Sequence, residues 1–247
     1  KFRYIVHAAA AASPAALAQN PKLACEEIAL HSQGVERALG WAREQGSVLL
    51  YLSDASVYGE ARENPIGEDD PAMKASWTRP ESALAETRRF AEALLLSHAR
   101  AFGTEVRIAR LFELYGPRMP EEGTVLGRWL RAARRGEDIV VAGKSRPYAL
   151  CHVEEAADAL TRLLRVNFTR PLNVGSPASL PQGEIAEHLA ALAGGKSRVV
   201  EARAPMGMKD APVSAAPNVQ SAWRALGWQP KRTMEEGLAT LFPRASA

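Results

Sequence analysis

The sequence predicts an α/β protein built on a doubly wound parallel sheet, followed by a smaller C-terminal α/β lobe. Short apolar runs rich in β-prone residues alternate with long stretches of helical periodicity. The run Val48-Leu49-Leu50-Tyr51-Leu52 is almost continuously apolar, as expected for a strand that is buried on both faces of a parallel sheet. Strands separated by helices require right-handed crossovers, which place helices on both faces of the sheet.

In the first half of the chain, three strands and two long helices follow from these patterns. Phe2 to His7 contains adjacent β-prone residues, and the small residues after it indicate a loop. Glycines at positions 46 and 103 end the two helical stretches. The predicted elements are a strand at 2–7, a helix at 21–45, a strand at 47–53, a loop at 59–79, a helix at 80–102 and a strand at 105–111.

After Gly116 the elements become shorter, which indicates a second unit. We predict helices at 121–135, 153–165 and 182–193, and strands at 138–142, 172–174 and 197–202. The expected organisation is a core over 1–118 and a lobe over 119–247, with strands and helices of the second part interleaving with the core. Such a lobe would cover the carboxyl ends of the sheet strands, where ligands bind in open parallel sheets.

The composition narrows the class of protein. Lysine and arginine total 31 against 28 acidic residues in 247, so the net charge of +3 is too small to argue for nucleic acid. Apolar runs do not reach the roughly 20 residues that span a bilayer. Two distant cysteines without a CxxC pattern fit a reducing compartment, and no metal-ligand cluster is visible. We therefore expect a cytoplasmic protein with no membrane, metal or nucleic-acid partner. The opening KFRYIVHAAAAASPAA reads as strand and loop rather than as a signal peptide, because His7 interrupts it.

Eight short strings occur in one order along the chain. They are HAAA at 7–10, SDASVYG at 53–59, ENPIGEDD at 63–70, AETRRFAEALL at 85–95, RLFELYGPR at 110–118, VVAGKSRPYALCHVEEAADAL at 140–160, LNVGS at 172–176 and RALGWQPKRTMEEGL at 224–238. Together they resemble the extended short-chain dehydrogenase/reductase family of NAD-dependent nucleotide-sugar epimerases, dehydratases and decarboxylases. UDP-glucuronate decarboxylases and sugar 4-epimerases look most similar.

The resemblance implies a Rossmann-type sheet that holds NAD and a C-terminal lobe that holds a nucleoside-diphosphate sugar. It also implies a homodimer formed by the helices at 21–45 and 80–102. Carried over position by position, the cofactor-binding residues would be Ala8, Ala9, Ser53 and Arg88. The substrate-binding residues would be Ser56, Glu113, Arg118, Arg146 and Tyr148.

One expected motif does not occur. The family opens with GxxGxxG, whose glycines let the backbone approach the pyrophosphate of the cofactor. This chain has 18 glycines, the first at position 34, and none is arranged as GxxGxxG or GxGxxG. By analogy the numbered residues begin at the fourth strand, so either the polypeptide is shortened or a segment precedes it. We favour a preceding segment, because a sheet that starts in its middle exposes a long apolar edge.

The catalytic positions are also changed. The resemblance implies a Ser or Thr near VYG and a Tyr-x-x-x-Lys on the next long helix, and these positions are Asp54, Leu84 and Arg88. Leucine has no proton to exchange, whereas positioned acid–base groups contribute about 10²–10⁴-fold to rate. Arginine stays charged and can still hold a ribose or phosphate oxygen. A buried Asp54 needs a cation, and Arg88 is the obvious candidate.

Two interpretations remain open from the sequence. The protein either binds a ligand as an accessory, scaffold or regulatory subunit without the usual proton-transfer chemistry, or is an active enzyme with Asp54 as base. Ser53, Ser56 and Tyr58 would form the hydrogen bonds and packing contacts at the end of the strand. For Ser56, contact with a ligand is the alternative. Glu113 and Tyr148 occupy positions where the resemblance leads us to expect Asn and Arg, and Arg146 could supply the charge that Tyr148 lacks.

Overall fold

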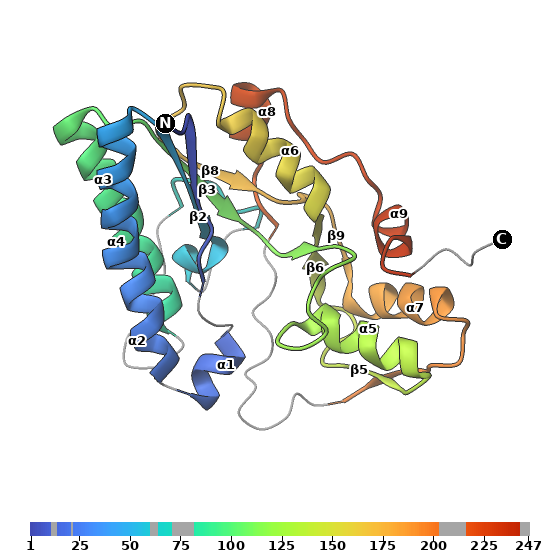
Figure 1. Cartoon of the computed structure of the whole chain (residues 1–247). Coiled ribbons are helices and arrows are strands. Elements are labelled where there is room, and N and C mark those ends of the chain that lie inside the picture. Colours follow the sequence, from blue (N-terminus) through green and yellow to red (C-terminus); the bar gives the residue numbers. More distant parts are fainter. Residues whose placement is uncertain (11–13, 21, 60–63, 71–81, 203–215, 243–247) are drawn as a thin grey trace.

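The computed structural model describes residues 1–10, 14–20, 22–59, 64–70, 82–202 and 216–242. Its main sheet is parallel, with strand order β1-β2-β3-β8. The strands are β1 (Tyr4–His7), β2 (Val48–Asp54), β3 (Val106–Leu111) and β8 (Pro171–Val174). Figure 1 shows the carboxyl ends of β1 to β3 pointing towards the second unit of the molecule.

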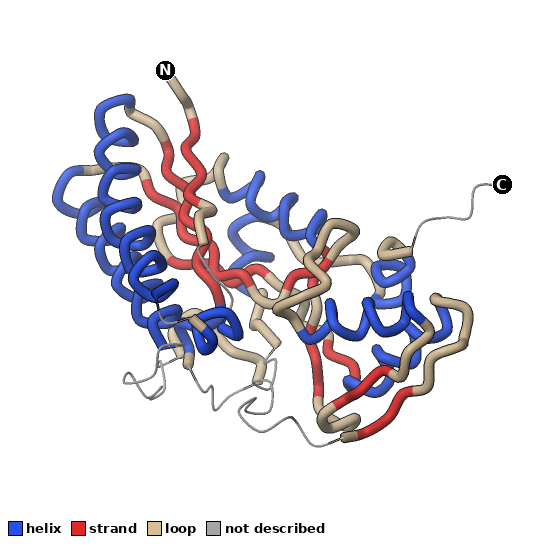
Figure 2. The backbone as a smooth tube through the Cα atoms, turned by 60° about the horizontal axis from the view of Figure 1, so that its bottom comes forward, coloured by secondary structure: helices blue, strands red, loops and turns tan. Residues whose placement is uncertain are grey.

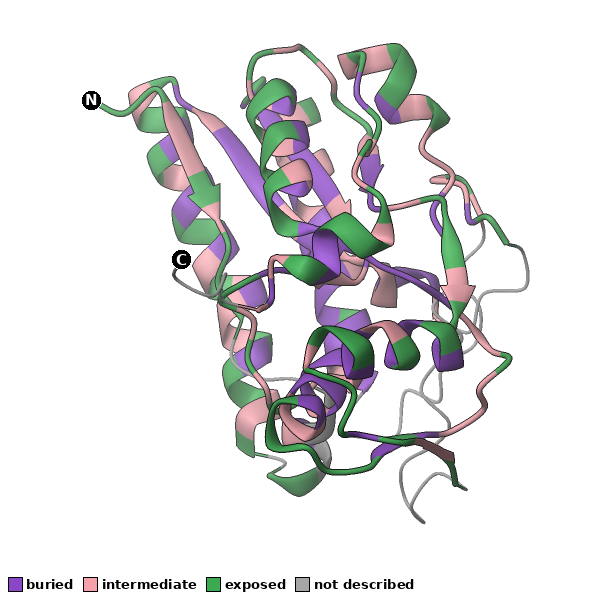
Figure 3. Ribbon diagram, turned by 90° about the vertical axis from the view of Figure 1, so that its right-hand side faces the viewer, coloured by how far each residue is buried: buried purple, intermediate pink, exposed green. Residues whose placement is uncertain are grey.

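Helices cover both faces of this sheet, because successive side chains of a strand point to opposite sides. Leu49 and Tyr51 pack against α3 and α4, whereas Leu50 packs against α6 and α8. Figure 2 shows the strands between these two helical layers, and the central strands β2 and β3 are largely buried in Figure 3. The helices are α3 (Val35–Gln45), α4 (Ser82–Phe102), α6 (Val153–Leu163) and α8 (Gln220–Leu226).

A second hydrophobic core lies beyond the carboxyl ends of the sheet (Figure 1). It is built around Trp129 and Leu130 of one helix and Ile185 and Leu189 of another. Its elements are α5 (Val125–Arg135), α7 (Gln182–Leu192), α9 (Met234–Ala239), β5 (Ile139–Val141), β6 (Pro147–Ala149), β9 (Ser179–Pro181) and β10 (Val199–Glu201). The short parallel pair β4 (Leu114–Tyr115) and β7 (Cys151–His152) connects this unit to the main sheet. The chain then returns to the main sheet through β8.

The two edges of the main sheet differ. On one side β1 is the outermost strand, and Val6 is 50% exposed. On the other side the loop 64–70 runs along β8, where Ile66 forms a parallel bridge with Pro217 and accepts a hydrogen bond from the Asn173 side chain. The backbone N–H of Asn173 in β8 also donates to the Glu68 carboxylate of this loop, so the loop covers part of the outer edge of β8, which is one way in which proteins protect sheet edges.

The predicted elements agree with the structure in type and order, with ends displaced by up to four residues. The helix expected at 21–45 is divided into α2 (Lys22–Ala29), the π-helical segment η1 (Leu30–Gly34) and α3. Several short elements did not emerge from the sequence patterns: α1 (Pro14–Gln19), the 3-10 turn η2 (Ala55–Tyr58), β4, β6, β7, β9, α8 and α9. Each has at most seven residues, too few for a clear period. Much of the loop predicted at 59–79 lies outside the described residues.

Candidate functional site

Asp54 is the last residue of β2 and directs the start of η2. Its Oδ1 accepts a hydrogen bond of 2.8 Å from the backbone N–H of Ser56, as a capping residue does at a helical turn. The turn places Val57 and Tyr58 in the core and ends at Gly59, whose φ of 63° favours glycine. The side chain of Asp54 remains 37% exposed, so this carboxylate faces the carboxyl-end side of the sheet while it orders the turn.

Arg88 on α4 lies between two carboxylates. Its Nε donates to Oδ2 of Asp54 at 3.1 Å, and its Nη1 donates to Oε1 of Glu27 at 2.5 Å. The expectation that Asp54 pairs with Arg88 is therefore confirmed. The Arg88 side chain is 6% exposed and that of Glu27 is fully buried. Burial alone would lower the pKa of the Arg88 guanidinium, but Asp54, Tyr51 and Glu27 outweigh it, and that pKa is raised.

The polar network continues from Glu27 to the main sheet. Oε1 of Glu27 lies 3.1 Å from Nε2 of His31, one helical turn later, and Nδ1 of His31 lies 2.8 Å from the Tyr51 hydroxyl. His31 belongs to the π-helical segment η1, and Gly34 of the same segment leaves room for the His7 ring. Burial raises the pKa of Tyr51, so this phenol stays protonated. Asp54, Arg88, Glu27, His31 and Tyr51 therefore form one continuous chain of contacts.

A second network binds β2, β3 and β8 together under the same edge. Arg110 donates to both carboxylate oxygens of Glu92 on α4 and to the Tyr58 hydroxyl, at 2.7–3.2 Å. The Tyr58 hydroxyl donates in turn to Oδ1 of Asn173 at 2.6 Å. Burial raises the pKa of Tyr58 to about 12, against the opposing effect of Arg110. Ser53 also belongs here, because its hydroxyl donates to Glu92 at 2.6 Å.

The residues predicted to hold NAD do not fit that group as the resemblance implies. Ser53 is buried, and its hydroxyl is directed to Glu92 rather than outwards. Arg88 uses Nε and Nη1 for carboxylates, so these donors are not available to a ribose. Ala8 and Ala9 follow β1 and are exposed, but they offer no side-chain donor. Leu84, at the position of the proton-exchanging tyrosine, is buried and apolar.

Among the predicted substrate residues, Glu113 and Tyr148 contact each other, Arg118 is exposed, and Arg146 and Ser56 are half-buried. Glu113 hydrogen-bonds the Tyr148 hydroxyl, and burial raises the pKa of both groups. This pairing explains how a carboxylate is tolerated at position 113, because the Tyr148 hydroxyl donates a hydrogen bond to Glu113. Arg118 is exposed after β4 and has no ion-pair partner among the described residues, and Arg146 lies half-buried before β6. Ser56 contributes its backbone N–H to Asp54, and its hydroxyl oxygen is buried without a hydrogen-bond partner among the described residues.

Sequence reasoning missed Glu27, Glu92, Arg110 and Asn173 as members of these networks. Glu27 and Glu92 lie on helices rich in charged residues. In such a sequence, a glutamate that will be buried cannot be distinguished from one that faces solvent. The signal that was available is a positive charge inside a predicted strand. Arg110 interrupts the strand 106–111, and a largely buried arginine requires an acidic partner.

No set of three or more His, Cys, Asp or Glu side chains is placed to hold a metal ion in the part of the chain that the structure describes. Among the same residues, every helix is too short or too polar to cross a bilayer.

Comparisons with known proteins agree with this architecture. Residues 1–175 match the model of the NAD dependent epimerase/dehydratase family. The chain is 32% identical over 239 residues to UDP-glucuronic acid decarboxylase 3 of Arabidopsis thaliana, covering 95% of this chain and 67% of that protein. It is 30% identical over 244 residues to UDP-glucuronic acid decarboxylase 1 of Danio rerio, of which it covers 55%.

Solved structures show the same fold. The UDP-glucose 4-epimerase of Thermotoga maritima, solved with UDP-glucose, superposes with a TM-score of 0.83 at 21% identity, over 97% of this chain and 76% of that one. RMD from Pseudomonas aeruginosa, complexed with NADPH, has a TM-score of 0.80 at 22% identity, over 97% and 78%. The family match over 1–175, the identity to the decarboxylases and the parallel sheet lead to one conclusion: this chain belongs to the NAD dependent epimerase/dehydratase family.

Proposed function

We propose that this protein binds a nucleotide sugar at the carboxyl end of its sheet without the family's usual proton transfer, and acts as a binding or accessory subunit. The observation that carries the proposal is Arg88, which lies between Asp54 and Glu27. It fills the place expected for a lysine and a cofactor ribose with an ion-pair network. Leu84, one turn earlier, supplies no phenol that could exchange a proton.

The substrate class is supported by the relatives and by charge. The relatives include proteins named as UDP-glucuronic acid decarboxylases, and the Thermotoga structure contains UDP-glucose. Arg118 carries a guanidinium that no other described residue neutralises. Arginine suits diphosphate recognition because it presents several N–H donors in a fixed plane.

Calorimetric titration with UDP-glucuronate tests the binding half of the proposal. We expect Arg118→Gln to weaken binding by about tenfold, the value of one lost charge-assisted hydrogen bond. Arg100→Gln on α4 is the matched control, because Arg100 is also exposed and unpaired in the described structure. Equal binding by wild type and Arg118→Gln, or no binding by wild type, would count against the proposed site.

The alternative function is an enzyme in which Asp54 is the base. The observation in its favour is the 37% exposure of the Asp54 side chain, which leaves the carboxylate within reach of a ligand. In that case Asp54→Asn would lower turnover of a nucleotide sugar by about 10²–10⁴-fold. If no turnover exists in the wild type, this alternative fails, and Asp54→Asn changes only stability and binding.

A further inference from the structure

A pocket of about 310 Å³ opens beside β8, away from the site at the carboxyl end. Pro171, which lines it, stands in register with Ile108 and Tyr51, whereas Val174 stands in register with Leu111 and Asp54. Three residues of strand correspond to about 10 Å, and β8 is two strands away from β2. The pocket is therefore separate from the Asp54 site.

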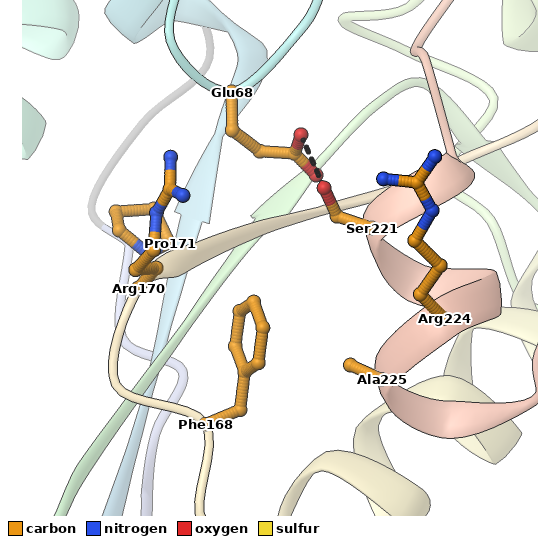
Figure 4. A pocket seen from close by; sticks show the side chains of 7 residues that line it. All are labelled: Glu68, Phe168, Arg170, Pro171, Ser221, Arg224 and Ala225. Carbon is orange, nitrogen blue, oxygen red and sulfur yellow. Dashed lines mark hydrogen bonds between the residues drawn. The ribbon is translucent and has the colours of Figure 1, made fainter.

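The body of the pocket is apolar. In Figure 4 the Phe168 ring stands between Pro171 on one side and Ala225 of α8 on the other. Phe168 precedes β8, Pro171 is the first residue of β8 and Ala225 belongs to α8, so the pocket is a space between the sheet edge and its covering helix. A planar ring fits such a space by stacking on Phe168.

The charged side chains around the pocket differ in how many of their hydrogen-bonding atoms already have partners. Glu68 accepts hydrogen bonds from the backbone N–H of Asn173 and from the Ser221 hydroxyl, at 3.1 and 3.0 Å. Arg170 is held by Asp69 at 2.5 Å. Arg224 also lines the pocket (Figure 4) but makes no hydrogen bond or ion pair with the rest of the described chain. The guanidinium at this pocket that has no partner among the described residues is therefore that of Arg224.

We propose that this pocket is a binding site for a small organic anion with a flat apolar body, of the aromatic carboxylate class. The ring would stack between Phe168, Pro171 and Ala225, and the carboxylate would accept hydrogen bonds from Arg224. A cationic ligand is disfavoured, because it would face the Arg224 guanidinium, and because both oxygens of Glu68 already accept hydrogen bonds from Asn173 and Ser221. The volume lies near the lower limit for small-molecule pockets, which favours a single ring over a larger ligand.

The test titrates the full chain with benzoate and, in parallel, with benzylamine and benzyl alcohol, which share the ring but not the charge. Binding is followed by ligand-observed NMR and calorimetry. Benzoate should bind and benzylamine should not. Arg224→Gln should weaken benzoate binding by about tenfold, and Ala225→Trp, which fills the pocket, should abolish it. Asp54→Asn should leave benzoate binding unchanged, which separates this site from the nucleotide-sugar site.

Arg37→Gln is the matched control, because Arg37 is exposed on α3 and removes the same charge far from the pocket. Melting temperature and circular dichroism establish that each variant is folded. The proposal is overturned if wild type does not bind benzoate, if benzylamine binds as tightly, or if Arg224→Gln and Arg37→Gln bind benzoate equally. Arg224→Gln decides the matter even if Ala225→Trp does not fold, since Arg224 is exposed and has no partner to lose.

Discussion

Arg88 pairs with two carboxylates that differ in their access to water. Asp54 is 37% exposed, whereas Glu27 is fully buried and also contacts His31. A buried carboxylate without a cation is costly, so Glu27 retains Arg88 more strongly than Asp54 does. The Arg88 guanidinium therefore stabilises a buried carboxylate, which a cofactor-binding lysine would not do. Under our proposal, this is the physical reason why Arg88 does not bind a cofactor.

This difference predicts an order of stabilities. Arg88→Met removes the guanidinium from the buried carboxylate of Glu27 and should cost about 3–5 kcal/mol of the free energy of unfolding. Asp54→Asn, at a partly hydrated position, should cost less, about 1 kcal/mol. Urea denaturation measures both. The double variant Arg88→Met/Glu27→Gln should recover part of the loss, and an Arg88→Met effect no larger than that of Asp54→Asn would contradict the assigned network.

Tyr58 gives the structure a predictable sensitivity to alkali. Burial raises its pKa from 10.0 to about 12. The folded state therefore favours the protonated phenol, so this stabilisation is complete below pH 10 and is lost as the pH rises towards 12. Denaturation midpoints measured from neutral pH to about pH 11 should fall above pH 10. Tyr58→Phe should start from a lower stability, because it loses the bonds to Arg110 and Asn173, and should show a shallower alkaline decline. An equally steep decline would show that Tyr58 is not its source.

At the scale of elements, the short helix α9 is positioned by its close approach to β4. A Cβ added at Gly237 would overlap the Tyr115 hydroxyl, and Tyr115 is buried in the core of the second unit. Thr233 and Glu236 form a capping box that starts this helix. The capping box therefore defines where α9 begins, and the close contact at Gly237 holds the helix against Tyr115.

Gly237→Ala should consequently lower the free energy of unfolding by about 1–3 kcal/mol, because the helix or the tyrosine must move. Gly40→Ala is the matched control in the interior of α3, where an added Cβ meets nothing within 4 Å. That substitution should stabilise the protein by about 0.5–1 kcal/mol, since alanine favours helix. Thermal unfolding of the two variants should shift in opposite directions; shifts in the same direction would contradict the close contact at Gly237.

Among the helices and strands, some were predictable from the sequence and others were not. The run 48–52 was visible as a strand because a strand buried on both faces is apolar at every position. The strand at 106–111 was visible from its remaining apolar residues, although Arg107 and Arg110 interrupt it. The π-helical segment η1 was not visible, because it interrupts a helix without changing its composition. The pairing of Asp54 with Arg88 followed from their opposite charges and from the family resemblance, which places both at the catalytic positions. Glu27 required knowledge of how α2 packs against α4.

At the scale of the whole molecule, the layer formed by α2, α3 and α4 carries large exposed apolar side chains. Ile28, Trp41, Phe90 and Phe102 are 49–57% exposed on these helices. Exposed apolar patches of this kind mark interaction surfaces. We therefore retain the prediction of a homodimer through the helices at 21–45 and 80–102.

Light scattering coupled to size-exclusion chromatography tests this prediction. Trp41→Glu should convert a dimer into a monomer, because burying an unpaired carboxylate opposes association. Trp223→Glu on α8 is the control, since Trp223 is similarly exposed at 55% but belongs to the opposite helical layer. A wild-type monomer would contradict the predicted dimer, and dissociation by Trp223→Glu alone would place the interface on the opposite helical layer.

The central claim is that this carboxyl-end site binds a nucleotide sugar but does not transform it. The direct measurement is mass spectrometry of UDP-glucuronate after prolonged incubation with stoichiometric protein and NAD, with calorimetry to establish that the sugar nucleotide is bound. The account predicts bound, unchanged UDP-glucuronate. Conversion to a decarboxylated, oxidised or epimerised product that depends on the protein and disappears in Asp54→Asn would contradict it and would establish the enzyme in its place.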